Sequence, residues 1–330
     1  MKNYILFISI FALLFSACST KEVYEPLYLD QDWEKYENAD ATIIDKSLNV
    51  ALLDNSKVLV EDGVLDLTVD EAHRVISHSD GWVISSSIDG DMLLISVNDN
   101  TKTELFEFKK SIAGATVNGD YLAVLFADNE IAIYSISSKK AIFKEKGSKS
   151  LAVDARIVNP YFMNDLVLFS TLDGKVIIVN IKLKKKLRTV IVSSEDNFNN
   201  IIYFNVIDNK IIAATSYKIL SLSAKEVREK YEIRSVVNDD KDMFITTKQG
   251  EVISLTPDLQ VNAKIKFPFA HFLGMISHGD KLYILEKEGY MIVLDKDMST
   301  YTVHEIDFED GFVFVADKFF YVADEKISIE

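Results

Sequence analysis

Cysteine and proline are scarce in this 330-residue chain, and its 36 basic residues are outnumbered by 51 acidic ones. Cys18 is the only cysteine, so the chain can form no internal disulfide, and no Cys/His spacing typical of a metal site occurs. Only four prolines accompany an apolar content of 48%, which favours a well-packed core. The formal net charge of −15 argues against nucleic-acid binding and against direct adhesion to anionic lipid.

Sequence motifs for catalysis are lacking as well. The five histidines show no HxxxH or HExxH spacing, and the chain has no GxSxG nucleophile elbow and no phosphate-binding loop. The many aspartates lie in turns, where turn geometry explains them, and the Asp-Gly pairs are too short for a calcium loop. We therefore expect a protein that is not an enzyme and that carries no cofactor and no metal.

The N-terminus has the features of a cleaved signal. Lys2 supplies a positive charge, residues 5–15 form an apolar core too short to span a bilayer, and small residues precede Cys18. A sole cysteine at this place is where lipid attachment requires one. We predict a lipoprotein signal peptide at residues 1–17, with lipidation at Cys18; the alternative is an ordinary signal peptide with an incidental cysteine.

The residues after the cysteine predict the location of the protein. Lys21, and the absence of Asp directly after Cys18, favour transfer to the outer membrane of a Gram-negative bacterium, with the protein facing the periplasm. Residues 18–38 lack hydrophobic alternation and are predicted to form a lipidated tether. Residues 39–330 hold a succession of strands and short turns, which predicts one folded domain.

One segment shape recurs through that domain: a short apolar strand, a tight turn with an acidic residue or glycine, and another apolar strand. The residues that open the second strand of each copy are Lys57, Asp91, Glu130, Lys175, Lys218, Glu251, Tyr290 and Lys326. Their spacing ranges from 33 to 45 residues. A repeat of this period built only from strands is typical of a β-propeller.

The clearest unit, residues 114–146, predicts four strands. They are A (115–117), B (121–126), C (131–136) and D (140–144). Strand B is almost wholly apolar, as expected for burial between neighbouring blades, and strand D is mixed, as expected at the outer edge. The paired turn residues between strands tolerate positive φ and suit two-residue hairpins. Each blade should therefore be a four-stranded meander.

The count of copies predicts an all-β fold with a single propeller of eight blades; seven is the alternative, if the weak copy near Lys57 merges with the last one. The last copy ends at strand C without a strand D, and an exposed sheet edge invites aggregation. Residues 29–36 precede the first full blade and are the natural donor of the missing strand. The ring is therefore predicted to close by pairing its N- and C-terminal strands.

Function is expected on the longer connections from strand D of one blade to strand A of the next, because loops on a rigid scaffold usually carry binding. Three connections stand out, at residues 148–163, 190–201 and 267–275. The candidate partner-binding residues in them are Tyr161, Phe162, Glu195, Asp196, Phe198, Phe267, Phe269 and Phe272. For the last three, packing between blades is the first interpretation, and an exposed patch that grips a partner is the alternative.

A lipoprotein signal joined to repeats such as DGKVIIVNIKLKKKLRTV (173–190) resembles the PQQ-like propeller repeat family, and within it the BamB lipoproteins of the β-barrel assembly machinery. The resemblance spans nearly the whole mature chain and includes the C-terminal FFYVADEKISIE (319–330). It implies an eight-bladed outer-membrane lipoprotein that binds the barrel-forming subunit through loops on one face. Quinoprotein-type repeats carry Trp in strand D, and the residues at that place here are Phe106, Phe143, Leu187 and Tyr231.

Three functions follow from these patterns. The first is a non-catalytic, lipid-anchored periplasmic scaffold that assists assembly of outer-membrane β-barrel proteins by binding partner proteins through propeller loops. The second is another binding or sensor propeller of the cell envelope. The third, which the lack of strand-D tryptophans disfavours, is a quinone-dependent enzyme.

Overall fold

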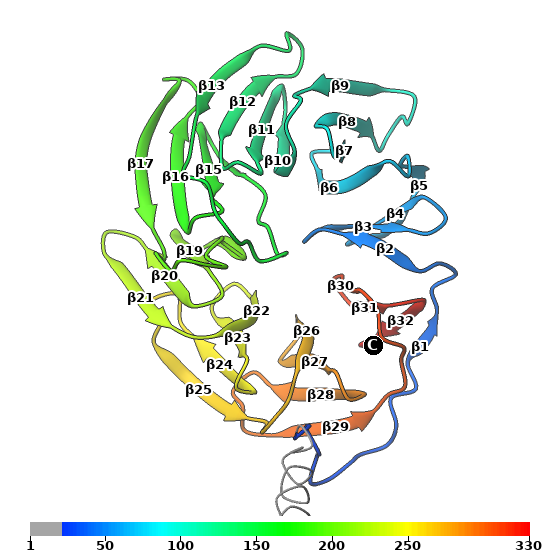
Figure 1. Ribbon diagram of the computed structural model, residues 1–330. Helices are drawn as coiled ribbons and strands as arrows, with labels where there is room; N and C mark the ends of the chain where they lie inside the picture. Colours follow the sequence, from blue (N-terminus) through cyan, green and yellow to red (C-terminus); the bar gives the residue numbers. More distant parts are fainter. Residues whose placement is uncertain (1–21) are drawn as a thin grey trace, which may run out of the picture.

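The computed structural model describes residues 22–330, and Cys18 and the predicted signal peptide lie outside them. Residues 22–330 contain strands and turns but no helix, and thus no helix that could cross a membrane. The 32 strands form eight antiparallel sheets of four strands each, arranged in a ring (Figure 1). The predicted all-β propeller with eight blades is confirmed, and the weak copy near Lys57 forms a blade of its own.

Each blade is a meander in which the strands follow one another from the centre of the ring outward, and we name them A to D in that order (Figure 1). Blades 1 to 4 consist of β2 (Ile43–Lys46), β3 (Val50–Leu53), β4 (Lys57–Val60), β5 (Gly63–Thr68); β6 (His73–Ser79), β7 (Trp82–Ser87), β8 (Asp91–Ser96), β9 (Thr103–Glu107); β10 (Ile112–Asn118), β11 (Tyr121–Phe126), β12 (Ile131–Ser135), β13 (Ala141–Glu145); β14 (Tyr161–Met163), β15 (Leu166–Ser170), β16 (Lys175–Asn180) and β17 (Lys185–Ile191).

Blades 5 to 8 follow the same plan, and the last blade takes its outer strand from the N-terminal part of the chain. They consist of β18 (Tyr203–Ile207), β19 (Lys210–Ala214), β20 (Lys218–Leu222), β21 (Glu226–Lys230); β22 (Ile233–Asn238), β23 (Met243–Thr247), β24 (Glu251–Leu255), β25 (Val261–Lys266); β26 (Phe272–His278), β27 (Lys281–Glu286), β28 (Tyr290–Asp295), β29 (Tyr301–Glu305); β30 (Val313–Val315), β31 (Phe319–Val322), β32 (Glu325–Ser328) and β1 (Tyr36–Asn38).

Burial follows the predicted order of strands. In blade 3, strand β11 is buried at every position after its first, whereas in blade 4 the outer strand β17 is exposed at every position but one. The B strands lie between two neighbouring blades, so both of their faces are covered. The hydrophobic core is therefore divided among the blade-to-blade interfaces rather than gathered at one centre.

Eight clusters of buried apolar residues fill these interfaces, one between each pair of neighbouring blades around the ring. The cluster between blades 8 and 1 includes Phe314 and Tyr321 of blade 8 and Ile43 and Leu59 of blade 1. Because this last interface is packed like the others, the ring is closed by side chains as well as by strand pairing.

The ring closes between the two ends of the described chain, as the sequence predicts. Strand β1 pairs antiparallel with β32, with Glu37 opposite Lys326. The closing strand begins at Tyr36, so it lies C-terminal to most of the predicted 29–36 donor. Residues of that stretch bond to blade 7 instead: the backbone N–H of Trp33 donates to the carbonyl of Glu305 at 2.8 Å.

The segment predicted as a tether packs in part on the propeller. Tyr24 is 5% exposed and lies edge-on to Phe267 and Tyr290 of blades 6 and 7. Trp33 is 8% exposed and donates its indole N–H to the carbonyl of Ser328 at 3.0 Å. Between these two anchors, Leu27 and Tyr28 are exposed. Residues 22–38 therefore run along blade 7 before they complete blade 8 (Figure 1).

Candidate functional site

The meander gives the ring two different faces. The A–B and C–D turns lie on one face, which we call the A–B face. The B–C turns and the connections from strand D to the next strand A lie on the other, which we call the D–A face. The three longer connections singled out in the sequence are all on the D–A face, so they share one surface.

The B–C turns hold the D–A connections in place through backbone hydrogen bonds. In four blades, the carbonyl of the turn glycine accepts from an N–H just beyond strand D. The pairs are Gly90 with Phe108, Gly174 with Val192, Gly250 with Phe267 and Gly289 with Ile306, at 2.8–3.0 Å. These glycines have φ between +76° and +93°, and a Cβ at Gly250 would lie 2.1 Å from the carbonyl oxygen of Phe267. Glycine is therefore required both by the backbone conformation and by the close approach.

Two of the longer connections form a single unit. The side-chain oxygen of Asn200, which is fully buried, accepts from the backbone N–H of Asp154 at 2.6 Å. Its amide donates to the carbonyls of Asp154 and Arg156 at 3.1 and 3.0 Å. The N–H of Phe198 also donates to the carbonyl of Ala152 at 3.0 Å. The connection after blade 4 therefore holds the connection after blade 3 in a defined conformation.

The connection after blade 3 reaches across the ring. Arg156 donates to both carboxylate oxygens of Asp154 at 2.8 and 2.5 Å, to the hydroxyl of Ser216 in blade 5 at 3.0 Å, and to the backbone carbonyl of Arg234 in blade 6. Burial alone would raise the pKa of Asp154, but the hydrogen bonds from Arg156 and Ser216 outweigh it and lower that pKa to about 2. The segment is thus tied to blades 5 and 6.

The predicted aromatic patch at 267–275 is divided by the fold. Phe267 and Phe272 are 2% and 4% exposed and pack with Tyr24 in the cluster between blades 6 and 7. Packing between blades therefore accounts for these two rings, and they are not available to a partner. Phe269 is 58% exposed and remains on the surface.

The other predicted contact residues do not converge on one site. Glu195 pairs with Lys218 at 3.1 Å, and Asp196 is exposed beside it. Phe198 is exposed, whereas Phe162 packs against the cluster between blades 3 and 4. Tyr161 is half-exposed and lies 5.3 Å, between ring centroids, from the ring of Phe204.

The structure adds exposed apolar residues that sequence reasoning missed. Five large apolar side chains are exposed on the D–A face, in one B–C turn and four D–A connections: Ile88, Leu151, Phe198, Phe269 and Phe312. Sequence reasoning missed Ile88, Leu151 and Phe312. The signal that could have identified them is a large apolar residue in a turn or connection, outside the apolar pattern of a strand. Phe198 and Phe269 also have positive φ, of 52° and 66°.

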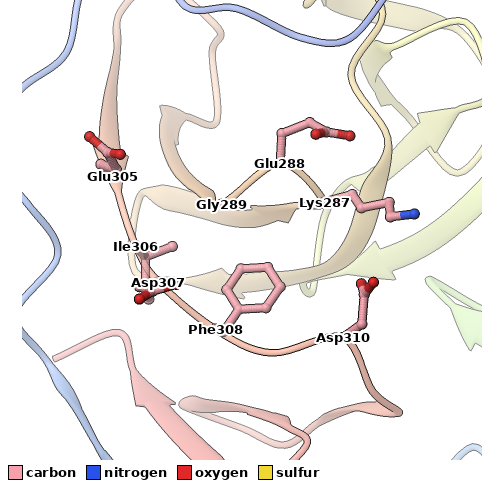
Figure 2. A pocket seen from close by; sticks show the side chains of 8 residues that line it. All are labelled: Lys287, Glu288, Gly289, Glu305, Ile306, Asp307, Phe308 and Asp310. Atoms are coloured by element: carbon pink, nitrogen blue, oxygen red, sulfur yellow. The ribbon is translucent and has the colours of Figure 1, made fainter. Parts of the chain in front are cut away.

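An acidic groove lies on the D–A face between blades 7 and 8 (Figure 2). It has a volume of about 770 Å³ and is lined by the B–C turn 287–289 and the connection 305–310. Carboxylates of Glu288, Glu305, Asp307 and Asp310 line it, with one amine, that of Lys287. No sequence motif marks this groove, because it forms from two segments that are separated along the chain. Its charge suits a basic segment of another molecule.

Titratable side chains of the described chain do not gather into a metal-binding set: in residues 22–330, no three His, Cys, Asp or Glu residues are placed to hold an ion. The central channel, in contrast, contains cavities lined by basic residues, of which Lys46 borders two. The features that the structure offers for recognition are thus the D–A face with its exposed apolar residues, the acidic groove and the channel.

The fold and these surfaces define the class of protein: an eight-bladed β-propeller with long connections on one face. No family model matches the chain. Among solved structures, BamB from Moraxella catarrhalis has a TM-score of 0.68 at 12% identity, covering 91% of this chain and 98% of that one. The C-terminal WD40 domain of Sif2 has a TM-score of 0.65 at 13% identity, covering 92% and 99%. At these identities the likeness concerns the fold alone.

Similarity in sequence connects the chain to another group. Two proteins named plasminogen-binding protein PgbB, from Helicobacter pylori strains J99 and 26695, are 34% and 33% identical to it. Each match covers 64% of this chain and 40% of the relative. The chain thus spans less than half the length of the curated relatives that it matches.

Proposed function

We propose that this chain is a non-catalytic propeller of the cell envelope that binds another protein through its D–A face. The observation that carries the proposal is the set of exposed apolar side chains on that face, in five of its turns and connections. Exposed apolar groups on a rigid scaffold contribute most to protein association when they are large and well positioned. The backbone bonds between the B–C turns and D–A connections supply that rigidity.

Backbone strain supports the same surface. Phe198 and Phe269 both adopt left-handed φ, which costs a residue with a Cβ roughly 1–2 kcal/mol and is a true outlier for a bulky side chain. Neither ring is buried, so packing in the core does not offset this strain. Strained residues that persist on a surface are candidates for a functional role.

The contribution of these rings can be tested with substitutions that relieve the strain. We expect F269N and F198N to change the free energy of unfolding by less than about 1 kcal/mol, because Asn tolerates this backbone conformation. Crosslinking to the partner from these loops in cells should fall at least about tenfold, as for a contact worth more than 1 kcal/mol. Leu183, 60% exposed in the turn between β16 and β17 on the A–B face, is the control; equal losses in L183N would refute the assignment.

For the location, we propose an outer-membrane lipoprotein that faces the periplasm and is anchored through Cys18. The support is the sequence around that residue. In membrane fractionation, C18S should move the protein from the membrane fraction to the soluble fraction. An unchanged distribution would show that the chain is held at the membrane in another way.

The first partner to test is the barrel-forming subunit of the β-barrel assembly machinery. The support is the likeness of fold to BamB together with the proposed location. Purification from detergent-solubilised membranes should then recover barrel-assembly subunits with this chain. Recovery of the chain without them, under conditions that preserve the assembly complex, would exclude this role.

The second candidate partner is plasminogen, which the names of the sequence relatives suggest. The purified chain should be immobilised and exposed to plasminogen in a surface plasmon resonance experiment. Saturable binding that F269N weakens and L183N does not would support this function. Absence of binding by the purified chain would exclude plasminogen binding as its function. The match covers only part of the relatives, so this test of the chain itself is needed.

The proposal that the chain is not an enzyme is also testable. A quinone-dependent enzyme would bind its quinone together with calcium and change the absorbance of the quinone. We expect no spectral change when purified protein is titrated with pyrroloquinoline quinone and Ca²⁺. A saturable change would instead favour the enzymatic function.

A further inference from the structure

Two cavities of the central channel have basic linings in an otherwise acidic protein. One cavity of about 350 Å³, which we call the cationic cavity, has Lys46, Arg156 and Arg234 as its only charged lining residues. A neighbouring cavity of about 480 Å³ is lined by Lys46 and Arg74 and likewise by no carboxylate. In a chain with a formal net charge of −15, these basic linings create a local positive potential inside low-dielectric walls.

Two of these four cations are neutralised by carboxylates outside the cavity walls. Arg156 forms its two-pronged contact with Asp154, and Arg74 lies 3.4 Å from a carboxylate oxygen of Asp45. Such pairs satisfy the charge of the arginine, so they do not by themselves require an anion in the channel.

The other two cations have no such partner among the described residues. Lys46 donates to the backbone carbonyl of Val313, and Arg234 contacts a ring nitrogen of His271 at 2.7 Å. For both groups, burial and then the charge of Arg156 lower the pKa, and no carboxylate raises it. Two half-buried cations therefore face the same cavity and repel a third, an arrangement that favours an anion between them.

Two unpaired donors belong to residues that line this cavity. The hydroxyl of Ser47 and the Nε of Arg234 are buried from solvent and have no hydrogen-bond partner in residues 22–330. Both residues line the cationic cavity. Buried polar groups in native proteins are nearly always hydrogen-bonded, so donors left over at a cavity indicate a ligand that accepts from them.

We propose that the cationic cavity binds a small organic anion: a carboxylate carried on an apolar body. The ammonium of Lys46, the hydroxyl of Ser47 and the guanidinium of Arg234 hold the carboxylate. The rest of the ligand lies against an apolar wall from blades 6, 7 and 8, which consists of Val236, Leu273, Met275, Phe314 and Val315.

The shape of the cavity fits this ligand class. Its volume lies in the lower range of small-molecule sites. Ser47 and Leu48, in the turn between β2 and β3, also line it, so it reaches the A–B face, while Arg156 of the connection after blade 3 borders it from the other side. Arg156, Val158 and Ile202 of the D–A connections line it too, so elements of both faces border the cavity. The binding residues lie inside the channel and are not the exposed apolar residues of the D–A face, so either proposal can fail without the other.

The direct test is isothermal titration calorimetry of the purified chain with four probes. Octanoate should bind saturably and raise the melting temperature, whereas octylamine, with the same apolar body and the opposite charge, should do neither. Acetate and inorganic phosphate should bind at least about tenfold more weakly than octanoate, because they lack the apolar body. No octanoate binding, equal binding of octylamine, or phosphate binding as tight as octanoate binding would each overturn the proposal.

Variants locate the binding. R234Q and K46Q should each weaken octanoate binding at least about tenfold, because each removes a charge-assisted hydrogen bond. K185Q removes the same charge from an exposed site at the start of β17 and should leave binding unchanged. Equal affinity in all variants would place octanoate elsewhere and overturn the assignment.

A stability measurement separates this role from a structural one. Without ligand, R234Q should keep or raise the melting temperature, because it removes a half-buried cation that has no carboxylate partner. A merely structural arginine would show the reverse: a lower melting temperature with unchanged octanoate affinity. That result would overturn the role given to Arg234.

Discussion

Asp154 and Arg156 lie two residues apart, yet their ion pair links the connection after blade 3 to blades 5 and 6. Arg156 donates to Ser216 and to the carbonyl of Arg234 while it holds Asp154. The hydroxyl of Ser216 also donates to Asp154 at 2.9 Å. At the scale of single residues, this ion pair and its hydrogen bonds fix the connection after blade 3 to blades 5 and 6.

The pH dependence of stability follows from this pair. The pKa of Asp154 is lowered to about 2 from an ordinary value of 3.8, so its contribution is present above about pH 4 and is lost as the pH falls towards 2. Because the pair is partly accessible to solvent, we expect D154N to lower the free energy of unfolding by only about 1–2 kcal/mol at pH 7. Urea denaturation at pH 7, 4 and 2.5 should show this difference shrinking with acid.

The exposed Asp196 provides the control for this experiment. D196N should change the free energy of unfolding by less than about 0.5 kcal/mol at every pH. A difference for D154N that is as large at pH 2.5 as at pH 7 would contradict the proposed origin of the effect, since the protonation of Asp154 would then not matter.

At the scale of the elements, local pattern predicts the strands closely. Six of the eight residues expected to open a C strand do so, and Glu130 and Lys326 lie within one residue of the start. Alternation and turn residues act over two to ten positions, so a single sequence contains this information. The connections between blades carry no such pattern, and their course was not predictable.

The turn glycines allow a matched test of the contact between turn and connection. We expect G250A to lower the free energy of unfolding by about 2–4 kcal/mol, because alanine adds left-handed strain and its Cβ would meet the carbonyl oxygen of Phe267. Gly119 also has positive φ, +55°, but has no atom within 4 Å of a built Cβ. G119A should therefore cost about 1 kcal/mol.

Chemical denaturation monitored by far-UV circular dichroism measures both variants. The difference between them isolates the close approach, since both carry the cost of the backbone conformation. Equal destabilisation would show that the connection moves aside and that the D–A face is less rigid than the hydrogen bonds indicate.

At the scale of the whole molecule, stability depends on closure of the ring. Trp33 packs in the cluster between blades 7 and 8 and bonds to Ser328, so it joins the N-terminal segment to the last blade. Loss of this anchor should loosen β1 and expose the edge of β32. Each blade in the ring is stabilised by its interfaces with its two neighbours, so the loss of one interface weakens the whole ring.

We expect W33A to lower the free energy of unfolding by about 3–5 kcal/mol, as for truncation of a buried aromatic side chain. Y28A removes an aromatic ring from the same segment, where it is 85% exposed, and should cost less than about 0.5 kcal/mol. Urea denaturation measures both. A small effect of W33A would mean that β1 alone closes the ring.

At the candidate sites, the sequence predicted which connections are long but not which of their side chains are exposed. The connections that carry the D–A face were identified from their length, but Phe267 and Phe272 proved to be core residues, and Ile88, Leu151 and Phe312 were missed. Aromatic content alone does not distinguish a ring that packs between blades from one that faces solvent. That distinction depends on which neighbouring blade lies above the residue.

Short-range patterns in the chain were sufficient for the blade repeat, the positions of the hairpins and the need for an N-terminal strand to complete the last blade. They suffice because strand and turn formation depend on neighbours a few residues away. The contact of Arg156 with blade 6 joins residues 78 positions apart, and the cationic cavity is lined by residues up to nearly 270 positions apart. Only closure of the ring brings those residues together, and burial and then the charge of Arg156 lower the pKa values of Lys46 and Arg234 there.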